Sequence, residues 1–85
     1  MKMNKYIFTF GVGQTNSGRY QIIFAEDYEA ARNIMIKHYG RRWCMGYDEE
    51  QWVEIVADMK YRGVPVEFPL EKIIYQEKAV KKNDK

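Results

Sequence analysis

The chain has little of what secreted and membrane proteins depend on. Its one cysteine, Cys44, cannot form a disulfide within the chain, which argues against a disulfide-stabilised secreted scaffold. No segment approaches the ~20 apolar residues that a membrane span needs. Residues 1–13 also lack the central apolar region of a signal peptide. These absences predict a protein of a reducing cytoplasm that has no membrane partner.

The sequence is equally short of residues for an active site or a metal centre. One histidine, His38, and one cysteine cannot complete a four-ligand zinc site, and the carboxylates lack calcium-loop spacing. His38 lies at helical spacing from Ala31 and Met35, so we expect it to be buried or half-buried in the core. We therefore predict no catalytic residue, no metal, no cofactor and no enzymatic activity. A Cys44–His38 dyad is the one enzymatic alternative.

Glycines occur near the N-terminus, but their context does not predict a phosphate site. Gly11, Gly13 and Gly18 lie in a segment rich in turn-forming residues. A phosphate-binding loop is followed directly by a helix, whereas a strand pattern follows here. We interpret residues 11–18 as a hairpin loop. Its polar side chains are available to contact a partner, and the candidates are Gln14, Asn16 and Arg19.

The formal charge of +2 is unevenly distributed along the chain. Residues 78–85 hold four lysines and one aspartate, so this tail carries +3 and residues 1–77 carry −1. A nucleic-acid-binding domain of this size usually gathers basic residues on its folded surface. The sequence therefore predicts one domain over residues 1–77 followed by a basic, frayed tail over 78–85. Nucleic acid is the less favoured partner.

Alternating apolar residues predict two strands, over residues 6–10 and 20–24. The loop between them makes an antiparallel hairpin the simplest arrangement. Large apolar side chains stand at positions 6, 8 and 10 and again at 20, 22 and 24. This shared alternation predicts that the two sets meet on one aromatic face.

Two helices and a further strand are predicted after the hairpin. Acidic residues at 26, 27 and 29 and the Gly40 stop indicate a helix over residues 27–39. Residues 43–47 alternate as a third strand. Asp48 and Gln51 have the spacing of a capping box for a second helix that continues to about residue 62. Segment 70–80 fits a helix after Pro69, with a strand over 72–75 as the alternative. The predicted fold class is a small single α+β domain. An antiparallel hairpin and a third strand pack against two helices in the order ββαβα, and the C-terminal segment after them is a helix or a strand.

The second predicted helix carries a row of acidic residues opposite its apolar side. Glu50, Glu54 and Asp58 follow one another at a spacing of four, and Tyr61 projects close to them. Like charges at this spacing slightly destabilise an isolated helix. A solvated outer face is the simple interpretation. The functional interpretation is an acidic contact surface, with Tyr61 as an interface anchor.

Several short strings resemble a family of small proteins from temperate phages and prophages of Gram-positive bacteria. The strings are Phe10-Gly11-x-Gly13-Gln14, Glu26-Asp27-Tyr28-x-Ala30-x-Arg32, Met35 followed by Tyr39-Gly40-x-x-Trp43, and Tyr47-x-Glu49-Glu50-x-Trp52. The resemblance covers about residues 6–52 and brings no catalytic residues with it. It implies an accessory phage protein that acts in the host cytoplasm. Some small phage proteins of this kind inhibit CRISPR–Cas nucleases.

The sequence thus leads to one main functional hypothesis and one alternative. The main hypothesis is a non-enzymatic binding protein that engages and modulates a host or phage protein, most concretely an anti-CRISPR inhibitor of a Cas nuclease. The alternative is a small regulatory protein that binds nucleic acid through its basic tail and through Arg41 and Arg42 beside Trp43.

Overall fold

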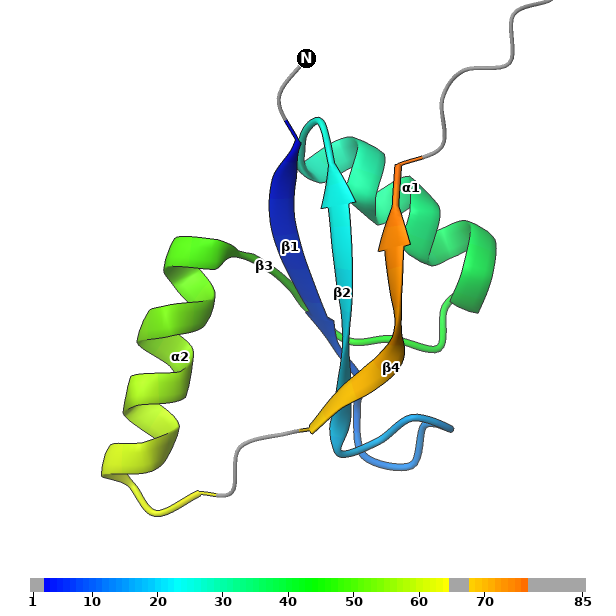
Figure 1. Cartoon of the computed structure of the whole chain (residues 1–85). Helices are drawn as coiled ribbons and strands as arrows, with labels where there is room; N and C mark the ends of the chain where they lie inside the picture. The colour runs from blue at the N-terminus through cyan, green and yellow to red at the C-terminus, as the bar shows by residue number, and fades with distance from the viewer. Residues whose placement is uncertain (1–2, 65–67, 77–85) are drawn as a thin grey trace, which may run out of the picture.

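The computed structural model of the chain describes residues 3–64 and 68–76. Within them, strands and helices follow in the order β1 (Asn4–Thr9), β2 (Arg19–Ala25), α1 (Tyr28–Tyr39), β3 (Gly46–Asp48), α2 (Glu49–Tyr61) and β4 (Phe68–Tyr75). The strands form one sheet in the order β3-β1-β2-β4 (Figure 1). The prediction of a small α+β fold that begins ββαβα is confirmed. The predicted basic tail, residues 78–85, lies outside the described residues.

The sheet is mixed, because its last strand joins in parallel. β1 is antiparallel to both of its neighbours, as the hairpin prediction required, whereas β4 runs parallel to β2. The helix predicted from residue 70 is wrong over 70–75, and the strand alternative is confirmed. The spacing of Leu70, Ile73 and Ile74 fits both patterns, and pairing with β2 decides between them. Residues 77–80 of the predicted segment lie outside the described residues.

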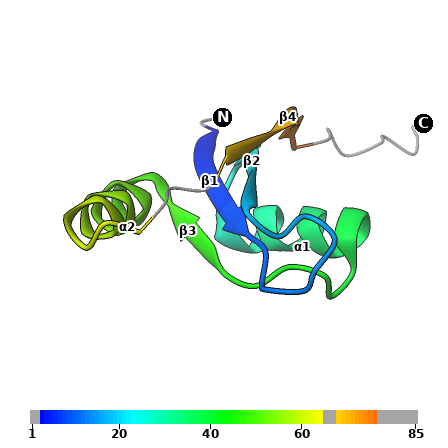
Figure 2. The same cartoon turned by 90° about the horizontal axis from the view of Figure 1, so that it is seen from below.

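The two helices lie on opposite sides of the sheet (Figure 2). α1 connects β2 to β3 across β1, and α2 lies on the return connection from β3 to β4 at the other edge. Such crossovers between parallel strands share one hand. Because these two run in opposite directions across the sheet, the same hand places their helices on opposite faces. Each face of the sheet therefore needs its own apolar residues.

The register between β1 and β2 places apolar residues on both faces of the sheet. It therefore contradicts the prediction of one aromatic face. Phe8 pairs with Gln21 and Thr9 pairs with Tyr20, so even-numbered residues of β1 oppose odd-numbered residues of β2. Paired residues point to the same face, which separates the two aromatic sets. The β1 set faces α1, where Phe8 stacks on Tyr28. The β2 set faces α2, where Tyr20 contacts Trp52.

The buried core lies between the sheet and α1. Its largest fully buried apolar side chains on this side are Phe8, Ile23 and Met35. Gly46 of β3 belongs to this packing, because a Cβ built there would overlap the Phe8 ring and lie 2.8 Å from the Tyr28 hydroxyl. The absence of a side chain at position 46 therefore lets the third strand approach the aromatic core.

The ends of both helices are fixed by the residues that the sequence indicated. Asp27 accepts a 2.8 Å hydrogen bond from the Ala30 amide at the start of α1, and Gly40 ends that helix with φ of 62°. Asp48 and Gln51 form the predicted capping box of α2, with bonds of 2.7 and 3.0 Å. These local bonds satisfy amides that the helices themselves leave unpaired.

The third strand is displaced from its predicted position of 43–47 to Gly46–Asp48. Trp43 belongs instead to the turn after α1. Its indole N–H donates to the Gly40 carbonyl at 3.0 Å, and its ring packs edge-on against Phe8 at 5.3 Å. Backbone bonding to β1 extends to the next residue, because the Cys44 amide donates to the Thr9 carbonyl at 2.8 Å.

Candidate functional site

α2 is attached to the sheet along one side and covers only half of that face. No residue of the helix is fully buried. The side chains that face the sheet are half-buried, and they are Trp52, Ile55, Val56 and Met59. Trp52 makes the ring contacts, to Tyr47 at 5.9 Å and to Tyr20 at 4.8 Å. The helix packs on β1 and β3 and leaves the β2–β4 half of the sheet less covered.

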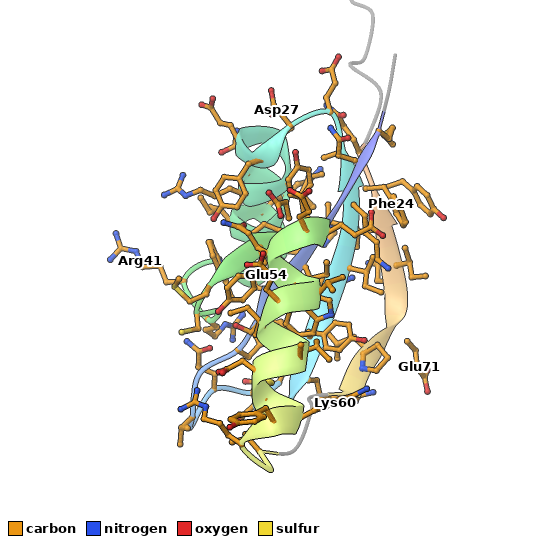
Figure 3. All side chains as sticks on the ribbon, turned by 90° about the vertical axis from the view of Figure 1, so that its left-hand side faces the viewer. Phe24, Asp27, Arg41, Glu54, Lys60 and Glu71 are labelled. Atoms are coloured by element: carbon orange, nitrogen blue, oxygen red, sulfur yellow. The ribbon has the colours of Figure 1, made fainter. Side chains whose placement is uncertain are left out.

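The predicted acidic row lies on the outer side of α2, where Glu54 faces the viewer in Figure 3. Glu50, Glu54 and Asp58 are all exposed. The Asp58 carboxylate is paired with Arg62, with an N–O distance of 2.9 Å. The negative charge of the row is therefore concentrated in its first half, at Glu50 and Glu54.

A row of apolar side chains runs beside the acidic row. Val53 is 63% exposed and Tyr61 is 91% exposed, and both project with the exposed Ala57 at a spacing of four residues. Only Tyr61 of this row was predicted as a contact residue. Val53 could have been found from the sequence, since Ala57 lies between it and Glu50 on the helical wheel, away from Trp52 and Met59. The outer surface of α2 thus combines acidic and apolar side chains.

The β2–β4 half of the sheet exposes a second group of apolar residues toward the α2 side. Phe24 stacks on Tyr75 with their ring centroids 5.0 Å apart and an angle of 13°. Tyr75 is 59% exposed and Ile73 is 46% exposed. Sequence analysis missed this group because the shared alternation placed Phe24 on the same face as β1's aromatic residues.

A hollow of about 670 Å³ joins these two surfaces at the N-terminal end of α2. Phe24 and Tyr6 contribute to it from the sheet, and Glu49 and Glu50 contribute from the first turn of the helix. Lys5 lines it as well. Its position means that the acidic row of α2 and the stacked pair at Phe24 are parts of one continuous surface.

The predicted loop residues lie elsewhere and have internal contacts. Gln14 accepts a 2.5 Å bond from the Gly11 amide and donates to the Trp43 carbonyl at 3.4 Å, so it holds the loop against the turn after α1. Arg19 donates to the Pro69 carbonyl at 3.3 Å. Asn16 and Arg19 line a shallow hollow of about 460 Å³ beside Tyr39 and β4. Asn16 and Arg19 therefore lie close together, but neither is part of the α2 surface.

His38 is exposed, which contradicts the expectation of a core or half-buried histidine. The inward row of α1 runs at a spacing of four through Ala31 and Met35, which are buried, and Tyr39, which is half-buried. Tyr39 takes the inward position in the last turn, where its ring packs on Phe10 at 5.2 Å. Cys44 is exposed on the turn that follows. Arg41 and Arg42 are also exposed, but the Trp43 ring beside them is committed to Phe8 and Gly40.

In residues 3–64 and 68–76, no three side chains of the His, Cys, Asp or Glu type are grouped so that they could hold a metal ion. Neither helix in the described parts has the length and apolar character that crossing a membrane requires.

Comparison with known proteins does not assign the chain to a family. No family model matches it, and no curated protein or solved structure matches it either. Proposals about its function therefore depend on the surfaces described above.

Proposed function

We propose that this chain is a small non-enzymatic binding protein that engages and modulates a host protein through the outer surface of α2. The observation that carries this proposal is the pairing of two exposed rows on one helix, Glu50 and Glu54 beside Val53 and Tyr61. The helix is long enough to present both rows over its full length, Glu49–Tyr61.

The two rows suit different parts of an interaction. Tyrosine is frequent among the residues that contribute most to interface affinity, because it buries a large ring at small entropic cost. Tyr61 is almost fully exposed and so is available for such burial. Within the described residues Glu50 and Glu54 form no ion pair, so their carboxylates favour a partner with a basic surface and speed its association. Together they favour a basic protein surface that has an apolar pocket.

The most specific form of the proposal is an inhibitor of a Cas nuclease acting in the bacterial cytoplasm. Its support is the resemblance of residues 6–52 to small phage proteins, together with an acidic helix that would suit a nucleic-acid-binding groove. Reconstituted Cas9 cleavage, with and without excess protein, tests this form. Unchanged cleavage by nucleases of several subtypes would exclude it and leave the general binding proposal open to the next experiment.

Affinity capture from a bacterial host tests the general proposal. The Glu50→Lys/Glu54→Lys variant should retain at most about a tenth of the wild-type yield of the main captured protein, corresponding to ~1.4 kcal/mol. The matched control is Glu26→Lys/Glu29→Lys, which reverses two exposed charges around the start of α1. Equal loss in both variants, or no loss in either, would contradict a specific role for α2.

A further inference from the structure

The β2–β4 half of the sheet, which α2 covers less, carries a group of apolar residues. Phe24, Ile73 and Tyr75 present apolar surface there, and Ile73 and Tyr75 are each about half exposed, at 46% and 59%. Exposed apolar residues that occur singly are common, but a stacked pair with an adjoining isoleucine forms a continuous patch. We call Phe24, Ile73 and Tyr75 the β4 patch.

The β4 patch continues into an acidic wall. Phe24 belongs both to the patch and to the 670 Å³ hollow, which Glu49 and Glu50 also line. Asp48 also lines the hollow, with one of its oxygens already bonded to the Gln51 amide at 2.7 Å. Lys5 offsets one of these three charges. A ligand lying on the patch would therefore meet net negative charge from the described residues at the end of α2.

We propose that this trough binds an extended, basic and apolar segment of the partner protein. Apolar side chains of the segment would cover Ile73 and Tyr75, and an arginine or lysine would enter the hollow between Phe24 and the carboxylates of Glu49 and Glu50. Charge complementarity selects the basic residue. The aromatic floor favours arginine over lysine, because a guanidinium group packs well on an aromatic ring. This inference rests on the proposed function, since it assigns the chemistry of the partner.

A defined peptide pair tests the inference without requiring the natural partner. The probe is a short peptide, blocked at both ends, that alternates arginine with leucine, and its control has glutamate in place of arginine. Both are titrated into the ¹⁵N-labelled full chain while amide resonances are recorded. We expect saturable shifts from the arginine peptide at residues 24, 49, 50, 73 and 75. The glutamate peptide should bind at least about tenfold more weakly, a difference of ~1.4 kcal/mol.

Variants then separate the trough from the rest of the surface. Ile73→Ser/Tyr75→Ser should weaken peptide binding about tenfold, and Glu49→Gln/Glu50→Gln should do the same without removing apolar area. Ile36→Ser is the matched control, because Ile36 is 43% exposed on α1 at the other side of the sheet. A retained amide spectrum shows that each variant is folded.

Four results would overturn the inference. These are equal binding of both peptides, shifts that the Ile73→Ser/Tyr75→Ser variant leaves unchanged, shifts confined to residues 53–61, and concentration-dependent self-association through the β4 patch. The third would place binding on the outer rows of α2, so the proposed function would stand while the trough would not. The fourth would make a second copy of the chain the occupant.

Discussion

The phenol of Tyr39 donates a 2.6 Å hydrogen bond to the side-chain oxygen of Gln21, which is fully buried. The amide nitrogen of Gln21 donates in turn to the Lys72 carbonyl at 2.6 Å. This connection joins α1, β2 and β4 at an irregularity in the sheet. Between the pairs Tyr20–Pro69 and Ile22–Ile73, β2 has one residue, Gln21, and β4 has three. A buried amide is costly unless it is bonded, so the irregular part of β4 depends on this network.

Removal of the Tyr39 hydroxyl should therefore destabilise the fold. Tyr39→Phe leaves the Gln21 oxygen without this donor, and we expect the free energy of unfolding to fall by ~1–3 kcal/mol in urea denaturation. Tyr61→Phe is the control. Because the Tyr61 side chain is 91% exposed, this variant should lose little stability. Equal stability of the two variants would show that the Gln21 network contributes nothing measurable.

The same tyrosine should make stability depend on alkaline pH. Burial raises the pKa of Tyr39 above its ordinary 10.0. Above pH 10.0 the unfolded chain ionises this group while the folded chain still holds the proton, so folding stability falls as pH rises from there toward the raised pKa. Below 10.0 both states are protonated and the effect is absent. Denaturation between about pH 8 and 11 should show a steeper decline for the wild type than for Tyr39→Phe. Identical slopes would contradict the account.

Gly46→Ala should disturb the core at β3. The added methyl group would overlap the Phe8 ring, and the Tyr28 hydroxyl would be 2.8 Å away. Overpacking of this kind costs ~1–3 kcal/mol. Gly11→Ala provides the comparison, since its nearest contacts are 3.5 Å and come from the side chain of Gln14. Thermal unfolding of the two variants distinguishes a steric effect from a general effect of replacing glycine.

The capping box of α2 should contribute more than its surface ion pair. Asp48→Ala removes the acceptor for the Gln51 amide and should cost ~0.5–2 kcal/mol. Asp58→Ala removes the exposed pair with Arg62, for which at most ~1 kcal/mol is expected. Urea denaturation of both variants gives the comparison. A larger loss for Asp58→Ala would reverse the importance assigned to the two aspartates.

Local patterns predicted the helices well because their ends are determined by nearby residues. Asp27, Gly40, Asp48 and Gln51 act within one turn of where they stand, so the sequence displays their roles directly. The strand register is different in kind. Whether Phe24 faces α1 or α2 depends on the alignment of β2 with β1, and alternation within each strand is compatible with either face.

In the candidate site, too, local features could be predicted from the sequence and features that depend on strand register could not. Exposure of the acidic row at Glu50 and Glu54 followed from helical periodicity. The β4 patch did not, because it requires both the β1–β2 register and the parallel addition of β4. The prediction for His38 was wrong because the inward row of α1 continues from Met35 by four residues to Tyr39. A step of three residues, to His38, is equally compatible with a helix.

Hydrogen exchange of the chain, free and bound to its captured partner, tests the central claim most directly. The account predicts that amides of α2, residues 49–61, exchange more slowly in the complex, while those of α1, residues 28–39, are unchanged. Protection confined to α1 or to the loop at residues 11–18, with α2 unaffected, would contradict it.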